Sequence, residues 1–197
     1  EIRIGYMGSL TYDSTGEYFE RYLMNYVLGS AFNSRINLNL RENKGYTYGA
    51  RSNFSASKIP GPFTASASVR ADATADSVVQ FVNEIKTYRD QGITPTELQF
   101  TKDAIGQSEA LDYETPRQKL GLLQQIITYN LPLDFTTQQQ NIINGLTQER
   151  INSLALAHLP LEKMVILVVG DKALINTSLT ALGYPIVELD TEANPVN

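Results

Sequence analysis

The sequence predicts an α+β domain with a mostly antiparallel sheet and helices packed on one face. Strand-like alternation of apolar residues lies toward the two ends of the chain, and a block of helical patterns lies between them. No internal repeat and no linker rich in Gly, Ser or Pro interrupts this order. We therefore expect residues 1–197 to form a single α+β domain.

A strand, a helix and a hairpin are expected near the N-terminus. Residues 1–7 alternate apolar and polar side chains, which is typical of a strand. Ser14, followed by Glu17, matches a capping box and predicts a helix that ends at Gly29. Alternation then returns with a turn signal inside it, so we expect a hairpin. Its strands are predicted at residues 46–56 and 63–70, with the turn at residues 59–62 between them.

Residues 31–44 fit two local structures. Ile36, Leu38 and Leu40 alternate with asparagines, and this period favours a strand. Ser34 could instead cap a short helix in which Ile36 and Leu40, four residues apart, face the core. The pattern alone leaves both alternatives open.

The centre of the chain is expected to be helical. Thr94 and Thr115 each match a capping box, and Thr147 is expected to cap a further helix that stops at Pro160. The helices are predicted at residues 74–92, 95–111, 116–127, 138–144 and 148–159. They are followed by a predicted buried strand at 163–169, a short helix, a strand at 186–189 and a loose tail from Thr191.

Composition argues against several classes of function. A net charge of −5 without any basic run disfavours a nucleic-acid partner. The absence of cysteine excludes disulfides and thiolate chemistry, and no apolar run approaches the length of a membrane span, so we expect no membrane partner. The chain opens in a predicted strand without Met or a signal peptide, which indicates a fragment or a processed product. Many Asn, Gln, Ser and Thr residues with modest charge suit a periplasmic or otherwise exported bacterial protein.

Metal and nucleophilic chemistry lack the residues that they need. A protein zinc site takes three or four His, Cys or carboxylate ligands. His158 is the single histidine and lies at a predicted helix end, where we expect a surface or capping role. No acidic loop suited to Ca²⁺ or Mg²⁺ and no Gly-x-Ser-x-Gly elbow is present. Residues 168–172 lack the several glycines of a phosphate loop and are interpreted as an ordinary turn.

Residues 40–50 carry groups that could stabilise developing negative charge. Arg41 is a permanent cation with five donors, and Tyr46 and Tyr48 would share one face if they lay on a strand. An Arg and a Tyr on one face could donate two hydrogen bonds to an oxyanion. Residue types alone slightly favour the other interpretation, an Arg in a surface salt bridge beside two half-buried tyrosines.

Three stretches of the sequence resemble one family. Residues 28–48 read Leu-Gly-Ser-Ala-Phe-Asn-Ser-Arg-Ile-Asn-Leu-Asn-Leu-Arg-Glu-Asn-Lys-Gly-Tyr-Thr-Tyr. This resembles the LGG-x-x-x-SRL…LRE-x-x-G-x-x-Y stretch of insulinase/pitrilysin-type zinc metallopeptidases, which include the mitochondrial processing peptidases. Residues 92–98 are similar to the family's G-(V/I)-T-x-x-E-L helix start, and residues 165–171 to its late strand. The three stretches occur in the family's order along nearly the whole chain.

The resemblance implies the zinc-free, C-terminal half of such a peptidase. In this family homologous α+β domains enclose a chamber, and one of them binds zinc through H-x-x-E-H, a motif absent from this sequence. Zinc is therefore expected in a homologous partner domain or subunit, with no cofactor in this chain, which alone should be inactive. The zinc-free half contributes an Arg and a Tyr that correspond here to Arg41 and Tyr48. They would hold the peptide substrate and stabilise the oxyanion during proteolysis.

The resemblance also bears on alternatives that the pattern left open. It implies a helix at residues 36–40 that ends at Gly45, and its spacing favours Tyr48 over Tyr46 as the tyrosine that faces the chamber. The family also offers a different function, a scaffold or peptide-binding protein that has kept the fold and lost proteolysis. A zinc motif elsewhere in the gene or in its neighbour would distinguish the two.

Overall fold

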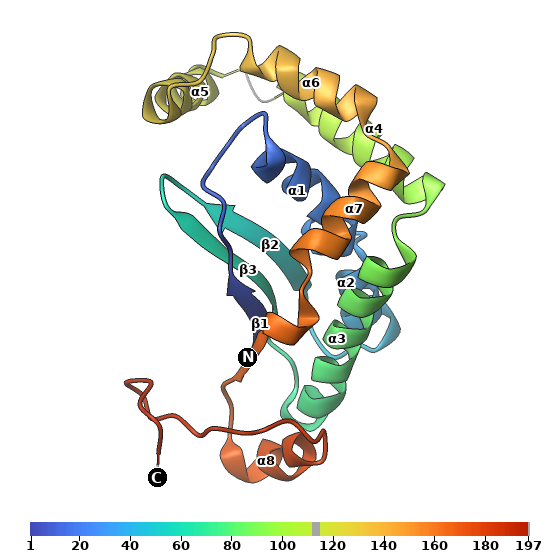
Figure 1. Cartoon of the computed structure of the whole chain (residues 1–197). Coiled ribbons are helices and arrows are strands. Elements are labelled where there is room, and N and C mark those ends of the chain that lie inside the picture. The colour runs from blue at the N-terminus through green and yellow to red at the C-terminus, as the bar shows by residue number, and fades with distance from the viewer. Residues whose placement is uncertain (112–114, 197) are drawn as a thin grey trace.

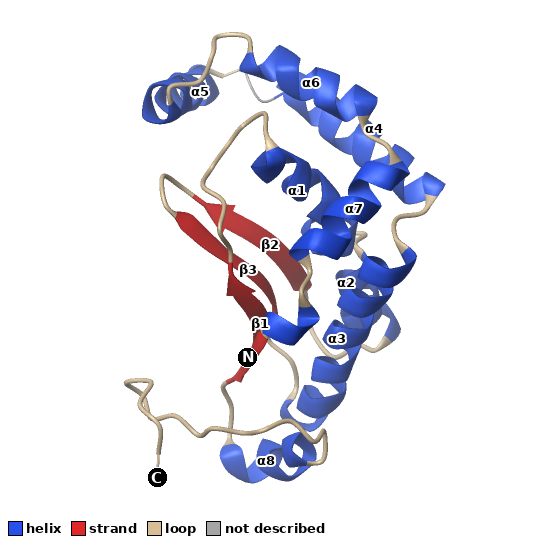
Figure 2. Cartoon of the chain, in the orientation of Figure 1, coloured by secondary structure: helices blue, strands red, loops and turns tan. Residues whose placement is uncertain are grey.

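A computed structural model describes the backbone of residues 1–111 and 115–196 and the side chains of residues 1–106 and 115–196. Its strands are β1 (Ile2–Met7), β2 (Ala50–Ala56), β3 (Pro60–Ala67) and β4 (Val165–Val168). They form a sheet in the order β2-β3-β1-β4, and every neighbouring pair is antiparallel. Most of the helices lie along one side of this sheet (Figure 1), and no described helix covers its other side (Figure 2). The predicted fold class is confirmed.

The helices follow the order expected from the sequence. The α-helices are α1 (Glu17–Asn25), α2 (Arg35–Asn37), α3 (Thr74–Gln91), α4 (Pro95–Leu111), α5 (Pro116–Tyr129), α6 (Phe135–Gly145), α7 (Gln148–His158) and α8 (Lys172–Thr180). Two π-helical segments, η1 (Tyr26–Ser30) and η2 (Leu38–Asn43), continue α1 and α2 without a break. Within the described part of the chain, none of these helices has the length and apolar character that crossing a membrane requires.

The core lies between the sheet and the helices. Ile2 and Ile4 of β1 and Phe63 of β3 point toward the helices and are almost completely buried. The stripe that α3 contributes from the other side consists of Val78, Phe81, Ile85 and Tyr88. Arg3 and Arg51 occupy alternate positions on their strands and are exposed on the uncovered side. One buried and one exposed face account for the period-2 pattern of these strands.

Local capping chemistry begins three of the helices as predicted. Thr94 Oγ1 accepts from the Glu97 N–H (3.2 Å), and Glu97 Oε2 accepts from the Thr94 N–H (2.8 Å). Thr115 and Gln118 repeat this reciprocal pair ahead of α5. Thr147 accepts from the backbone N–H three residues later, at 3.2 Å. Each arrangement satisfies N–H groups that a helix start leaves without partners.

Within residues 31–44 the chain is helical from Arg35 to Asn43, so the strand alternative is excluded. Ser34 occupies the position before α2, although its hydroxyl makes no capping hydrogen bond. Ile36 and Leu40 are 0% and 1% exposed, because their helical spacing directs both into the core. The period-2 alternation of this segment therefore arises by coincidence from a helix with asparagines between its apolar positions.

Several predicted boundaries are wrong near the N-terminus. Ser14 does not cap α1, since Gly16 precedes that helix, and the Ser14 carbonyl instead accepts from Gln139 Nε2 at 2.7 Å. The first hairpin strand begins at Ala50 because the Tyr46 N–H is still bonded to the preceding helix. The turn and the second hairpin strand shift as well, to residues 57–59 and Pro60–Ala67.

The C-terminal predictions are only partly confirmed. The predicted buried strand exists as β4, but Val165 and Leu167 are 70% and 44% exposed. β4 lies at the end of the sheet, and these two residues face its uncovered side. Residues 186–189 do not join the sheet, and Leu189 forms only an isolated bridge with Pro195. An apolar β-branched run thus identified a strand without revealing how much of it is covered.

Candidate functional site

The helix that carries Arg41 ends in a left-handed turn at Gly45, as the resemblance implied. Gly45 has a φ of 63°, and its N–H donates to the Arg41 carbonyl at 3.1 Å. The Tyr46 N–H reaches back to the Leu40 carbonyl at 2.9 Å. A Cβ at position 45 would meet nothing within 4 Å, so only the positive φ favours glycine there. The chain therefore reverses within the short segment that separates Arg41 from Tyr48.

Arg41 lies over an exposed aromatic ring. Its guanidinium carbon is 4.5 Å from the centroid of the Phe32 ring, and Phe32 is 66% exposed. Arg41 Nε is also 3.4 Å from Glu42 Oε1, and a third of the Arg41 side chain remains exposed. An ion pair with an adjacent exposed residue contributes little stability and leaves guanidinium donors for another acceptor.

Tyr48 is fully exposed, yet the backbone around it is fixed by hydrogen bonds. Its side chain is 100% exposed. Thr47 Oγ1 donates to the Ser68 carbonyl at 2.7 Å and accepts from the Gly49 N–H at 3.1 Å. The next N–H, that of Ala50, donates to a buried asparagine side chain at 2.9 Å. No hydrogen bond or ion pair within residues 1–106 and 115–196 involves the Tyr48 hydroxyl or joins it to Arg41.

Tyr46 has a different environment, so the shared face expected for the two tyrosines is not formed. The Tyr46 hydroxyl donates to Asp76 Oδ2 at 2.8 Å, and Lys44 Nζ lies 3.1 Å from the same oxygen. This hydrogen bond to Asp76 raises the pKa of the Tyr46 hydroxyl. Tyr46 therefore ties the turn to the start of α3, whereas Tyr48 points away from the protein.

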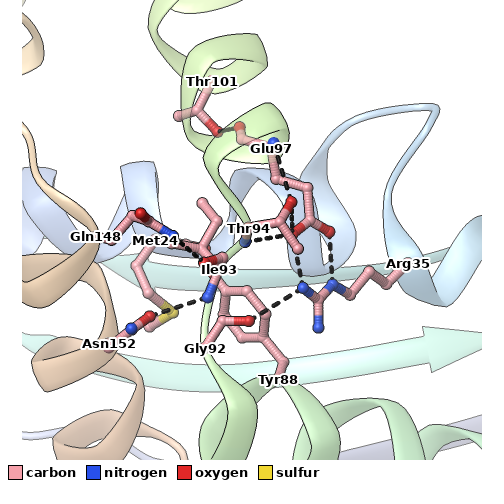
Figure 3. Close-up of polar contacts among 10 residues, drawn as sticks. All are labelled: Met24, Arg35, Tyr88, Gly92, Ile93, Thr94, Glu97, Thr101, Gln148 and Asn152. Atoms are coloured by element: carbon pink, nitrogen blue, oxygen red, sulfur yellow. Dashed lines mark hydrogen bonds and ion pairs between the residues drawn. The ribbon is translucent and has the colours of Figure 1, made fainter.

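Arg35 joins two of the sequence motifs that had suggested the family. Its Nε and one terminal nitrogen each lie 2.6 Å from a carboxylate oxygen of Glu97 (Figure 3). The same terminal nitrogen donates to the Gly92 carbonyl at 3.1 Å. The guanidinium carbon is 4.9 Å from the centroid of the buried Tyr88 ring. Sequence reasoning missed this pair, although Arg35 and Glu97 both stood in the motifs.

The charges of this pair stabilise one another despite partial burial. Burial alone would raise the pKa of Glu97, but hydrogen bonds from Arg35 and Thr94 hold it below its ordinary value. Burial likewise opposes the charge of Arg35, and Glu97 still raises the pKa of the guanidinium. The segment between the two partners is fixed further by Asn152 and Gln148 of α7, which bond to the Ile93 N–H and carbonyl at 2.9 and 2.7 Å.

His158 lies at a helix end, as expected, and takes part in a side-chain pair. Its Nε2 is 2.7 Å from Glu17 Oε1, and its carbonyl accepts from the Tyr6 hydroxyl at 2.7 Å. Burial and the nearby Arg21 lower the pKa of His158, while Glu17 partly opposes this shift. Arg150 also faces the imidazole and disfavours its protonation.

We expect His158 to make the stability of the protein depend on pH. The imidazole pKa is lower in the folded state, so around and below its ordinary pKa the unfolded state binds more protons. The free energy of unfolding should therefore fall as the pH decreases from about 7 toward 5. His158→Gln should flatten that part of the profile in urea unfolding experiments. An unchanged slope between wild type and variant would contradict the assignment.

The His, Asp and Glu side chains of the described residues are not gathered into a metal site. No cluster of three or more His, Cys, Asp or Glu side chains suited to an ion occurs among them. The turn after β4, considered above as a phosphate loop, is closed by Asp171, whose Oδ1 accepts from the Ala173 N–H at 2.9 Å. Asp171 thus caps α8, in agreement with the interpretation as an ordinary turn.

Comparisons with known proteins agree with this fold. The family model of the peptidase M16 inactive domain matches residues 4–105, about half of the chain, including Arg41 and Tyr48. The non-peptidase homolog YmxG of Helicobacter pylori is 28% identical over 152 residues, which are 76% of this chain and 35% of that protein. The uncharacterized zinc protease YmxG of Bacillus subtilis is 26% identical over 140 residues, 70% of this chain and 34% of that protein. The chain spans about a third of the length of these curated relatives.

A solved structure shows the same architecture. The crystal structure of a peptidase M16 inactive domain from Pseudomonas fluorescens superposes with a TM-score of 0.73 at 26% sequence identity. The matched region covers 84% of this chain and 40% of that chain. The likeness therefore extends beyond the segment around Arg41 and Tyr48 to most of the described domain.

Proposed function

The chain belongs to the peptidase M16 inactive-domain family, and from this membership we propose that it holds the peptide substrate for a zinc metallopeptidase. The zinc and its H-x-x-E-H motif would belong to a homologous partner domain or subunit, because this sequence contains a single histidine and no cysteine. The reaction served would be hydrolysis of a peptide bond, and the chain alone would be inactive.

The structural observation that supports the proposal is the placement of Tyr48. Binding residues are often found on loops that a rigid scaffold positions, and exposed aromatic side chains are frequent contact residues. Tyr48 is fully exposed, while Thr47 holds the backbone on both sides of it. A large side chain with no covering atoms on a fixed backbone is suited to meeting a ligand.

Arg41 and Tyr48 would act as hydrogen-bond donors to the substrate backbone. Arg41 keeps a permanent charge and has donors that its weak pair with Glu42 does not use. The Tyr48 hydroxyl would donate to the carbonyl oxygen as it becomes an oxyanion. A bound zinc ion in the partner would polarise the same carbonyl and activate water. The present chain would thus supply orientation and charge stabilisation.

The test uses the intact protein together with its zinc-bearing partner. Arg41→Ala and Tyr48→Phe should each lower the turnover of an unstructured peptide by about 10²-fold, because each removes a donor to the developing charge. Zinc content should remain unchanged, since neither residue is a ligand. Turnover is measured by cleavage of a fluorogenic peptide, and zinc by elemental analysis.

Tyr46→Phe provides a matched control for Tyr48→Phe. It also removes one phenolic hydroxyl, but that hydroxyl is bonded to Asp76 and lies off the proposed contact surface. Turnover should stay close to that of the wild type. Equal turnover in the wild type, Arg41→Ala and Tyr48→Phe would rule out the proposed roles.

A second candidate is a peptide-binding or scaffold protein without proteolytic function. The name of the Helicobacter pylori relative, a non-peptidase homolog, favours this alternative. It predicts that neither the rest of the polypeptide nor a partner encoded nearby carries H-x-x-E-H. In that case Arg41→Ala should weaken the binding of an unstructured peptide, although no cleavage occurs in any variant.

A further inference from the structure

Asn37 connects the two parts of the candidate site. Its side chain is almost completely buried, and both ends of its amide are used. Nδ2 donates to the Phe32 carbonyl at 2.7 Å, and Oδ1 accepts from the Ala50 N–H at 2.9 Å. One side chain thus bridges the loop before α2 and the first residue of β2.

The first of these hydrogen bonds acts on the surroundings of Arg41. The Phe32 carbonyl that Asn37 holds belongs to the residue whose ring lies beneath the guanidinium. Asn37 also precedes Arg41 by four residues in the same continuous helix, so the two side chains lie on a similar side of it. Asn37 therefore holds the backbone of the residue whose aromatic ring Arg41 rests against.

The second hydrogen bond acts on the loop of Tyr48. Ala50 follows Tyr48 by two residues, at the start of a strand that lies at the end of the sheet. Its N–H is bonded to Asn37 and does not point freely into solvent. Thr47 thus joins the loop to the Ser68 carbonyl, just after β3, and Asn37 joins it to the helix that carries Arg41.

We propose that Asn37 is a positioning residue that sets the spacing between the Arg41–Phe32 pair and the Tyr48 loop. The proposal rests on the proposed function, because the spacing matters only if Arg41 and Tyr48 both contact the peptide. Asn37 does not itself contact the substrate. Its amide holds the backbone segments next to the two donors in a fixed relation before any peptide arrives, which reduces the ordering that binding requires.

The protein contains a matched control in Asn25. Asn25 is also buried, and its amide joins a helical segment to β2: Nδ2 donates to the Ser52 carbonyl at 2.7 Å, and Oδ1 accepts from the Ser52 hydroxyl at 2.6 Å. These contacts involve neither Arg41 nor Tyr48. Asn25→Ala therefore removes a comparable buried amide while leaving the candidate site in place.

The first measurement follows hydrogen exchange in the intact protein. Asn37→Ala should accelerate exchange at residues 47–50 by about 10-fold or more, because the Ala50 N–H loses its acceptor. Exchange along α3 should be unchanged. Asn37→Asp retains an acceptor for Ala50 and should restore much of the protection, whereas Asn25→Ala should leave residues 47–50 as in the wild type. Unchanged exchange at residues 47–50 in Asn37→Ala would overturn the proposal.

The second measurement is a double-mutant cycle on peptide turnover with the zinc-bearing partner. Tyr48→Phe should cost about 10²-fold in the wild type and in Asn25→Ala, but only a few-fold in Asn37→Ala, where the hydroxyl is no longer in position. The full cost of Tyr48→Phe in Asn37→Ala would also overturn the proposal. If Tyr48→Phe has no effect in the wild type, the proposed function fails, and hydrogen exchange alone then decides whether Asn37 positions the loop.

Discussion

Arg35→Ala should lower the free energy of unfolding by about 3 kcal/mol, because it leaves a partly buried carboxylate without its partner. The Arg35 and Glu97 side chains are 18% and 25% exposed. The substitution removes both bonds to Glu97, the bond to the Gly92 carbonyl and the contact with the Tyr88 ring. Urea unfolding followed by circular dichroism measures the change.

Arg150→Ala is the appropriate control, since it breaks a surface ion pair of similar geometry. Arg150 Nε lies 2.8 Å from Glu20 Oε1, but the Arg150 side chain is 45% exposed. Exposed pairs contribute about 0–1 kcal/mol, so this variant should unfold close to the wild type. Equal losses in the two variants would show that burial does not distinguish the pairs.

The Arg35–Glu97 pair also predicts the response to acid. The pKa of Glu97 is lower in the folded state, so the unfolded state binds more protons as the pH falls. The contribution of the pair is complete above the ordinary carboxylate range and is lost as the pH falls through the folded pKa. This fall in the free energy of unfolding occurs at lower pH than the fall assigned to His158. Arg35→Ala should remove the fall that is due to Glu97.

Gly29→Ala should lower the free energy of unfolding by about 3 kcal/mol for a steric reason. A Cβ at position 29 would overlap Ser52, including its backbone nitrogen. Backbone of β2 cannot move aside as the end of a flexible side chain can, and the Asn25 contacts hold Ser52 in place. Glycine here permits η1 to lie directly against β2. Thermal and urea unfolding measure the loss.

Gly121→Ala should instead raise the free energy of unfolding. Gly121 lies within α5, and a Cβ there would meet no atom within 4 Å. Alanine restricts the unfolded chain and favours the helix, so we expect a gain of about 0.5–1 kcal/mol. A lower free energy of unfolding in both variants would indicate that the effect of Gly29→Ala comes from local backbone preference and not from contact with Ser52.

The parts of the fold that depend on neighbouring residues were predictable from the sequence. Thr94 and Thr115 begin helices because their capping partners lie three residues away. The capping box at Ser14 was misleading because tertiary contacts bury Ser14 and the helix starts after Gly16. The exposure of Val165 was not predictable, since it depends on which face of the sheet the helices cover.

The candidate site was predictable to a lesser extent. The resemblance selected Arg41 and Tyr48, and their roles stay predictions. The apolar–polar alternation could not predict that Tyr46 and Tyr48 have different environments, because the hydrogen-bond partner of Tyr46 is Asp76, 30 residues away. The Arg35–Glu97 pair spans 62 residues and was missed for the same reason. Side-chain partners at such separations follow from tertiary structure alone.

The hydrogen bonds of Thr47 have a thermodynamic consequence for any ligand of Tyr48. The entropy of ordering residues 47–49 is lost when the protein folds, so a ligand does not have to remove it again. What remains free is the Tyr48 side chain, whose immobilisation costs about 0.5–1.5 kcal/mol. A mobile loop would lose further backbone freedom on binding. Folding stability and ligand affinity are thus linked through the Thr47 hydroxyl, because the hydrogen bonds that it makes in the folded protein lower the entropic cost of binding a ligand at Tyr48.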